Sequence, residues 1–265
     1  MIDLRDLTWS KNPRQTQGTG GTYLKAERVE NGVKIYYKMS NYNSEIGVYG
    51  HESILEVLVC RYFAELDIPC AEYELINATV TVDGKVFNAY ISKSPDFKKP
   101  GESKVALEAY YLLNKTGNES ILDFCRRAGF GDYIDTTFLA DFLIINRDRH
   151  DANIEVLRNN GSIRLAPLFD NGLCLTAPCV NAELLKSFDF TQNHKTNNAL
   201  GSPFLFDNLN YISKPVSVKK ITKDTIDGIF TDIENILPSN HVGILKQALI
   251  WRYDYAKHKK FLCER

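Results

Sequence analysis

The chain has 265 residues, of which 44% are hydrophobic and 25% charged, and its formal net charge is −1. This composition is typical of a folded soluble protein with one large domain or two lobes. The balanced charge gives no support to nucleic acid or a membrane surface as partner, although it leaves room for a local charged patch. No apolar run is long enough to cross a bilayer, residues 1–6 lack the pattern of a signal peptide, and the six cysteines lack metal-ligand spacing, so we expect a cytoplasmic protein with reduced thiols.

The first third of the chain alternates between strand and helix patterns. Two pairs of β-rich runs are joined by Asn31-Gly32 and Asp83-Gly84, which favour hairpins because their turns match the twist of the strands. Between the two pairs, apolar side chains recur at helical spacing. The predicted strands, helix and strands are, in chain order, residues 22–26, 33–38, 51–66, 73–82 and 86–92. This order predicts a β-rich, nucleotide-binding N-terminal lobe over residues 1–93.

The rest of the chain is mainly helical. Proline and glycine in residues 94–101 predict a linker, so we expect a second, helical lobe over residues 94–265. The predicted helices are residues 102–115, 120–128, 133–145 and a helical tail over 222–260. Gly129 is expected to end the second helix, and Ser239 is expected to cap the last one. A hairpin over residues 154–166 separates the third helix from the tail.

The strongest motif is Asp148-Arg149-His150-Asp151-Ala152-Asn153, at the end of the third helix. Asp148 and Asn153 are five residues apart, which is the spacing of a kinase catalytic loop. In that template the aspartate accepts the proton of the attacking hydroxyl, while the asparagine and a later aspartate bind magnesium. Asp170 is placed to be the later aspartate, because the hairpin over residues 154–166 returns the chain toward Asn153. The motif therefore predicts phosphoryl transfer from ATP with Mg²⁺.

A structural alternative exists for the same residues. Asp148 would then cap backbone amides, and Asp170-Asn171-Gly172 would be an ordinary polar turn. Arg147 and Arg149 are expected to be solvated or paired with carboxylates. His150 has three open roles, namely binding a phosphate, orienting Asp148, and making a structural hydrogen bond.

The segment before the first predicted strand is rich in glycine. Gly18, Gly20 and Gly21, followed by Thr22, would let backbone N–H groups approach a phosphate, although a flexible terminal loop is the alternative. The segment does not fit the full G-x-G-x-x-G pattern. No GK[ST] sequence follows it, which excludes a P-loop.

A kinase also needs a strand lysine for the phosphates and a helical glutamate to pair with it. Lys38 ends the second predicted strand, and Lys25 and Lys34 are its competitors. Glu52 and Glu56 both lie on the following helix. We prefer Glu56, because a carboxylate within an apolar stripe requires a partner.

The motif around Asp148 and the run Leu165-Ala166-Pro167-Leu168-Phe169-Asp170-Asn171-Gly172 resemble the HipA-like family of bacterial serine/threonine kinases. That family's fold is similar to the fold of phosphatidylinositol kinases. The resemblance covers roughly residues 15–210 and is strong at 139–172. It implies a two-lobed α+β kinase fold in which Asp148 is the catalytic base, Asn153 and Asp170 bind Mg²⁺, and Lys38 binds the ATP phosphates.

The resemblance also implies partners and regulation. These are a protein substrate with a Ser or Thr acceptor, autophosphorylation at Thr16, Thr19 or Thr22, and a toxin role restrained by a small antitoxin protein. Two features depart from the family: the chain is too short for the extra N-terminal subdomain of longer members, and Asn171-Gly172 stand where a Phe-Gly switch would be. Direct nucleic-acid or membrane binding is not expected. A small-molecule or lipid kinase and a pseudokinase binding module remain alternatives.

Overall fold

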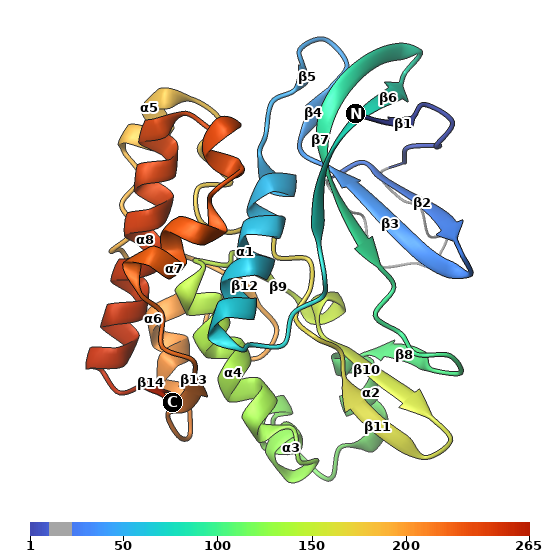
Figure 1. The fold of residues 1–265 in the computed structure, drawn as a ribbon. Helices are drawn as coiled ribbons and strands as arrows, with labels where there is room; N and C mark the ends of the chain where they lie inside the picture. Colours follow the sequence, from blue (N-terminus) through green and yellow to red (C-terminus); the bar gives the residue numbers. More distant parts are fainter. Residues whose placement is uncertain (11–22) are drawn as a thin grey trace.

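A five-stranded curled sheet forms the N-terminal part of the computed structural model, which describes residues 1–10 and 23–265 (Figure 1). The strand order is β1-β6-β7-β3-β2, with β1 parallel to β6 and the other pairs antiparallel. The strands are β1 (Ile2–Leu4), β2 (Lys25–Glu30), β3 (Val33–Met39), β6 (Glu74–Val82) and β7 (Lys85–Pro95). Both predicted hairpins are confirmed, whereas β1 was not predicted.

The helix α1 (Glu52–Leu66) lies between this sheet and the C-terminal helices (Figure 1). Ala26, Tyr37 and Ile91 point into a core on one face of the sheet. Because strand residues alternate between faces, Lys38 and its register partner Ser92 point to the opposite face, where α1 packs. A short hairpin connects β3 to α1 and consists of β4 (Tyr42–Asn43) and β5 (Gly47–Val48).

Two boundaries differ from the prediction. The strand β7 continues through Ser94 and Pro95, which pair with β3, so this strand enters the predicted linker. The predicted helix over residues 102–115 begins with a strand, β8 (Ser103–Ala106), and only then becomes α2 (Leu107–Asn114). The strand forms because β8 pairs with β10 (Glu155–Asn159), which also pairs with β11 (Ser162–Leu165). Pairing with a strand that is distant in the sequence has therefore overridden the local helical pattern.

Helices dominate the C-terminal part, where α4 and α8 pack together in the largest apolar core along with α1 (Figure 1). The α-helices are α3 (Ile121–Arg127), α4 (Gly131–Leu143), α5 (Ala182–Lys186), α6 (Leu205–Asn208), α7 (Lys223–Ile229) and α8 (Ser239–His258). Gly129 follows α3 with a φ of 81°, as expected of the residue after a helix end. Ser239 does not cap α8; the N-cap is Pro238, and Ser239 is the first helical residue.

Short elements complete the described chain. The 3-10 turns are η1 (Asp151–Asn153), η2 (Leu209–Tyr211) and η3 (Ile233–Asn235). The remaining strands are β9 (Asp148–Arg149), β12 (Asn197–Asn198), β13 (Val216–Val218) and β14 (Leu262–Glu264). All six cysteines have free thiols. Among residues 1–10 and 23–265, no helix has the length and apolar character needed to span a membrane.

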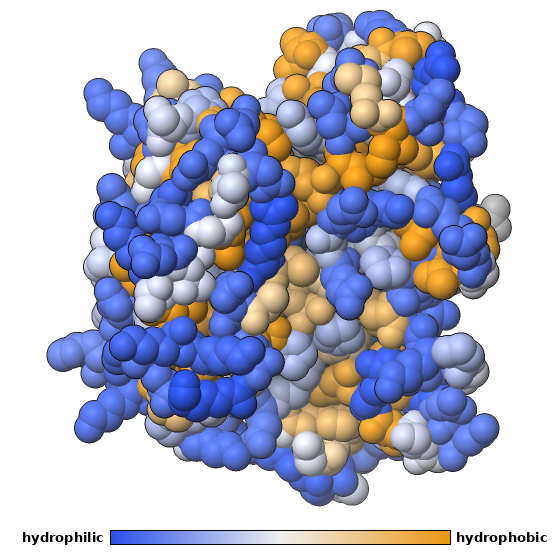
Figure 2. All heavy atoms as spheres, viewed as in Figure 1, coloured by the Kyte–Doolittle hydropathy of each residue, from blue (hydrophilic) through white to orange (hydrophobic). Residues whose placement is uncertain are grey.

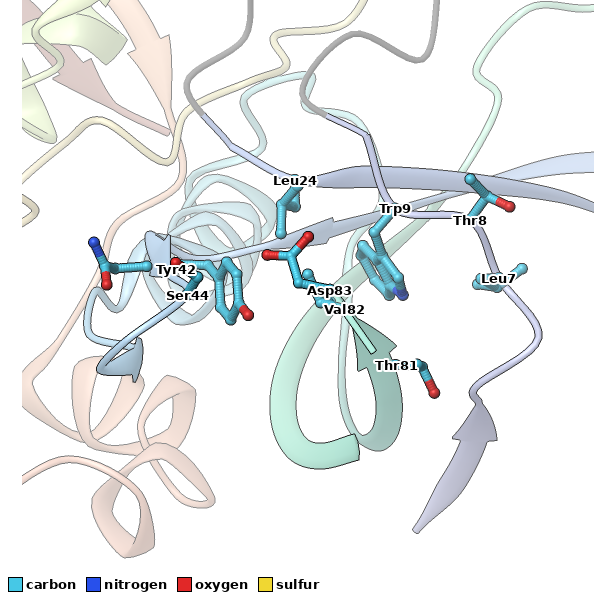
Figure 3. A pocket seen from close by; sticks show the side chains of 10 residues that line it. Leu7, Thr8, Trp9, Leu24, Tyr42, Ser44, Thr81, Val82 and Asp83 are labelled. Carbon is cyan, nitrogen blue, oxygen red and sulfur yellow. The ribbon is translucent and has the colours of Figure 1, made fainter. Parts of the chain in front are cut away.

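A cavity of about 490 Å³ opens at the edge of the curled sheet. Figure 3 shows Trp9 and Tyr42 on either side of Val82, with Leu24 nearby. Leu24 precedes Lys25 and packs with the sheet's core, so the cavity lies on the face opposite to Lys25. This cavity is therefore separate from the site described below.

Candidate active site

The predicted catalytic loop follows α4 through a turn with an unusual backbone. Ile145 has a φ of 51°, which is costly for a β-branched residue and is held by the surrounding core. The loop then forms β9, which pairs in parallel with β12, so that Asp148 lies beside Asn197. The Asn197 side-chain amide donates to Oδ1 of Asp148 at 3.2 Å. Asp148 is thus oriented by a side chain from a segment 49 residues away.

Arg149 ties the catalytic loop to the segment that carries Asp170. Its side chain is fully buried and forms an ion pair with Asp141 of α4 at 2.8 Å. One guanidinium nitrogen donates to the backbone carbonyls of Asn153, at 3.3 Å, and Phe169, at 3.1 Å. The other terminal nitrogen donates to the Asn171 side chain at 2.6 Å. Arg149 is therefore paired with a carboxylate, which is one of the two predicted states, and holds both functional segments together.

Arg147 differs from that prediction. It donates to the backbone carbonyl of Leu175 at 2.7 Å, and burial lowers the pKa of its guanidinium. Arg147 is therefore partly buried, and among the described residues its partners are backbone carbonyls and not a carboxylate.

The predicted magnesium ligands, Asn153 and Asp170, lie on the two segments that the Arg149 guanidinium connects. The Asn153 side-chain nitrogen donates a hydrogen bond to the Asp148 backbone carbonyl at 2.9 Å. The Asn153 side-chain oxygen is therefore available to coordinate a metal ion. Asp170 supplies a carboxylate. Within the described residues no three His, Cys, Asp or Glu side chains gather to hold a metal. The amide and carboxylate suit Mg²⁺, which is usually bound by one or two protein oxygens together with nucleotide phosphates and water.

The Lys38 ammonium lies between two carboxylates. Its Nζ is 3.1 Å from Oε1 of Glu56 and forms a second ion pair with Oδ1 of Asp170. Glu56 also accepts a hydrogen bond from the Ser92 hydroxyl at 2.7 Å. Burial would lower the pKa of Lys38, but the charges of Asp170 and Glu56 outweigh it and raise that pKa. Lys38 is therefore held as a cation inside the protein.

Asp170 meets a second lysine. Nζ of Lys25, at the start of β2, lies 3.4 Å from Oδ2 of Asp170. Burial would raise the pKa of Asp170, but the charges of Lys38 and Lys25 outweigh it and lower that pKa well below its usual range. Asp170 is thus ionised and has a φ of 55°, a conformation that aspartate tolerates better than most residues. Lys34, the other competitor of Lys38, pairs instead with Glu27 at 2.7 Å.

The structure distinguishes the two candidate glutamates of α1. Glu52 accepts hydrogen bonds from the Asn41 backbone at 3.0 Å and from its side chain at 2.5 Å, so it anchors the start of the helix. Glu56 is the one that meets Lys38. The chain after Asp170 passes close by, since a Cβ on Gly172 would lie 3.3 Å from both Lys38 Nζ and the Glu52 carbonyl. Glycine at this position allows the close approach.

His150 faces Asp148 across a longer gap. Its Nδ1 accepts a hydrogen bond from the Ala152 backbone at 3.1 Å, so in a neutral ring the proton lies on Nε2. That Nε2 is 3.8 Å from Oδ2 of Asp148. The hydrogen bond to Ala152 is structural, and the orientation of Nε2 also suits a role beside Asp148.

A cavity of about 370 Å³ adjoins the catalytic loop. His150, Asp151 and Asn197 form one wall, and Glu108 and Tyr111 of α2 contribute another. Since Asn197 lines this cavity and also contacts Asp148, the cavity lies next to the candidate base. Figure 2 shows apolar residues within the recess between the sheet and the helices, with polar residues along its rims.

The predicted phosphate-binding and autophosphorylation residues of the glycine-rich segment lie outside the described part of the chain. They are Thr16, Gly18, Thr19, Gly20, Gly21 and Thr22. Tyr23 follows this segment, and its ring lies 5.0 Å from Lys38 Nζ in a cation–π contact.

Sequence reasoning missed three contributors to the site. Asp141 pairs with Arg149, and its position within an apolar helix was an available signal of the same kind as that of Glu56. Asn197 carried no signal, because its contact with Asp148 depends on the pairing of β9 and β12. Lys25 was considered only as a substitute for Lys38, whereas both lysines reach Asp170.

Comparisons with known proteins establish the fold. Neither a family model nor a curated protein sequence matches the chain. The crystal structure of the Helicobacter pylori proinflammatory kinase CtkA is similar with a TM-score of 0.60 at 19% identity, over 96% of this chain and 94% of that chain. HipA of Shewanella oneidensis MR-1, solved with HipB and operator DNA, has a TM-score of 0.46 at 15% identity, over 93% of this chain and 66% of that one. The chain therefore has the α+β kinase fold of CtkA, as predicted.

Proposed function

We propose that this protein is an ATP- and Mg²⁺-dependent kinase that phosphorylates Ser or Thr hydroxyls of a protein. The observation that carries the proposal is that the Lys38 ammonium contacts both Glu56 and Asp170. Arg149 also donates to the backbone carbonyls of Asn153 and of Phe169, which precedes Asp170. These are the residue types and relative positions that phosphoryl transfer requires.

The chain's residues have distinct roles in this proposal. Asp148 accepts the proton of the attacking hydroxyl, and the Asn197 side chain, which also lines the adjacent cavity, holds the Asp148 carboxylate by a hydrogen bond. Lys38 binds phosphate oxygens while Glu56 keeps its ammonium in place. Asn153 and Asp170 would hold Mg²⁺, which neutralises charge on the phosphates when bound.

The polar-turn alternative does not describe these side chains. In the described residues, the Asp148 carboxylate accepts from the Asn197 side chain, and the Asp170 carboxylate accepts from two lysines. Neither caps a backbone amide there. Two ammonium groups on one partly buried carboxylate repel each other, which favours a functional role over an ordinary turn.

Cell-level roles extend the proposal. The sequence resemblance supports a toxin restrained by a small antitoxin protein, and the six free thiols suit a cytoplasmic location. Expression of the wild-type protein and of Asp148→Ala in a bacterial host tests the toxin role. Growth arrest by the wild type alone supports it, and equal growth of both strains contradicts it.

The direct test is incubation of the pure protein with radiolabelled ATP and Mg²⁺, followed by phosphopeptide mapping. We expect label on Ser or Thr in the wild type and none in Asp148→Ala, which should still bind ATP. Asp132→Ala is the matched control, because Asp132 is 82% exposed and pairs only with a surface lysine in the described structure. Label confined to added metabolites or lipids favours a small-molecule or lipid kinase. ATP binding without any transfer favours a pseudokinase.

A further inference from the structure

Lys25 and Lys38 are directly opposed residues on two neighbouring antiparallel strands. Directly opposed residues on such strands project from the same face of the sheet, and like charges in this arrangement repel each other. The backbone of Lys25 is also held from its other side, where its N–H and C=O pair with Ser10 at 2.8 and 2.9 Å. The position of Lys25 is therefore well defined despite the unfavourable pairing.

The carboxylate of Asp170 compensates for this repulsion. Lys38 Nζ meets Oδ1 of Asp170, and Lys25 Nζ lies 3.4 Å from Oδ2. Lys38 has a further partner in Glu56 and a side chain only 9% exposed. The Lys25 side chain is 31% exposed, and within the described residues its one ion pair is with Asp170. Lys25 is thus the ammonium that can leave Asp170 most easily.

We propose that Lys25 is a second phosphate-binding lysine, which shields Asp170 in the free protein and moves to a phosphate oxygen of the nucleotide when the metal–nucleotide binds. This rests on the proposed function. A divalent cation at Asp170 would displace the nearby ammonium by charge repulsion. The phosphates that arrive with the cation then offer Lys25 a stronger, charge-assisted partner.

The test compares ATP with adenosine, which lacks phosphates. Dissociation constants are measured by calorimetry with Mg²⁺ for the wild type, Lys25→Met, Lys25→Arg and Lys34→Met. We expect Lys25→Met to weaken ATP binding about tenfold and to leave adenosine binding unchanged. Lys25→Arg should bind ATP nearly as the wild type does. Lys34 lies on the same face of the same hairpin but pairs with Glu27, so Lys34→Met should change neither constant.

Binding of Mn²⁺ without nucleotide, monitored by electron paramagnetic resonance, should change in the opposite direction to ATP binding. Lys25→Met should bind this metal more tightly than the wild type, because one competing ammonium has been removed from Asp170. A simple loss of folded structure would weaken both metal and ATP binding, and thermal unfolding of each variant identifies it. In that case Lys25→Arg decides: ATP affinity close to that of the wild type supports the proposal, and a tenfold loss overturns it.

The outcomes separate this inference from the function on which it rests. A wild-type protein that binds no ATP overturns the proposed function and this inference together. A wild-type protein that binds ATP, with Lys25→Met equal to it, overturns the inference alone. Equal losses of ATP and adenosine affinity also overturn it, because they place the effect outside the phosphates.

Discussion

Nζ of Lys38 lies 3.1 Å from Oε1 of Glu56, although the two residues are 18 positions apart on a strand and a helix. Both side chains are buried, so each charge depends mainly on protein groups for its partners. The pair connects β3 to α1 at the point where Asp170 approaches from the other side. The position of α1 is therefore linked to the position of Lys38, the lysine that we propose binds phosphate.

The Lys38–Glu56 pair is expected to behave as one unit. Glu56→Gln should weaken ATP binding in the wild-type background, because Lys38 loses the carboxylate that orients it. The same change should have little further effect in a Lys38→Met background, with a coupling energy of about 1–3 kcal/mol. A double-mutant cycle on ATP affinity measures this. Glu65→Gln, at an exposed position of the same helix, is the control. Additive losses would show that the two residues act independently.

Arg149 is expected to be essential for stability. Arg149→Met should lower the free energy of unfolding by about 3–5 kcal/mol, because it leaves Asp141 buried without its cation. Arg149→Lys keeps the charge but cannot donate to Asp141, Asn171 and the backbone together, so it should still be clearly destabilising. Urea denaturation measures both. Arg5→Met removes an exposed ion pair and should leave the transition unchanged. A similar midpoint for Arg149→Met and the wild type would refute the bridging role.

Acid is expected to destabilise the fold through a pair of buried histidines. His241 Nε2 forms a 2.7 Å hydrogen bond with the Thr176 hydroxyl. The His241 ring packs edge-on against the His51 ring, with 4.6 Å between the ring centroids. Burial and the charge of His51 lower the pKa of His241 to about 4, from an ordinary value of 6.5. Burial also lowers the pKa of His51, an effect that the charge of Glu52 opposes.

The direction of this pH dependence follows from the difference in proton binding between the folded and unfolded protein. Between pH 6.5 and 4 the unfolded chain binds a proton at His241 that the folded protein does not, so the free energy of unfolding falls as pH falls. The shift of the His241 pKa corresponds to at most about 3 kcal/mol, which is the upper limit of its contribution to this loss. Chemical denaturation at several pH values measures the slope, which His241→Gln should reduce. His258→Gln, on the exposed side of α8, should retain the wild-type slope. An unchanged slope in His241→Gln would show that His241 does not contribute to the acid destabilisation.

Autophosphorylation of the glycine-rich segment remains a prediction of the sequence resemblance. A phosphate on Thr16, Thr19 or Thr22 would add about −1.5 to −2 charge near the nucleotide phosphates, so ATP affinity should fall. Mass spectrometry of the wild type and of Asp148→Ala tests this. Phosphate on residues 16–22 in the wild type alone, together with weaker ATP binding, is the expected result. A segment free of phosphate, or one whose phosphate leaves ATP affinity unchanged, would exclude this form of regulation.

The sheet and most of the helices could be predicted because their signals are local. The turn residues Asn31-Gly32 and Asp83-Gly84 have positive φ angles, which these residue types tolerate, and so they defined both hairpins. The strand β8 could not be predicted. Its residues have helical spacing, and their strand conformation depends on hydrogen bonds to β10, which begins nearly fifty residues later.

Five residues of the candidate site, Asp148, Asn153, Asp170, Lys38 and Glu56, could be predicted from the sequence. The spacing of Asp148 and Asn153, the arrival of Asp170 after a hairpin, and a carboxylate within the apolar stripe of α1 are all local patterns. Which charged groups come into contact depends on the tertiary structure. Lys38 and Lys25 reach Asp170 across 132 and 145 residues, and Arg149 joins the two functional segments through backbone carbonyls. Such contacts depend on the path of the whole chain, because a long-range ion pair leaves no periodic signal in the sequence around either partner.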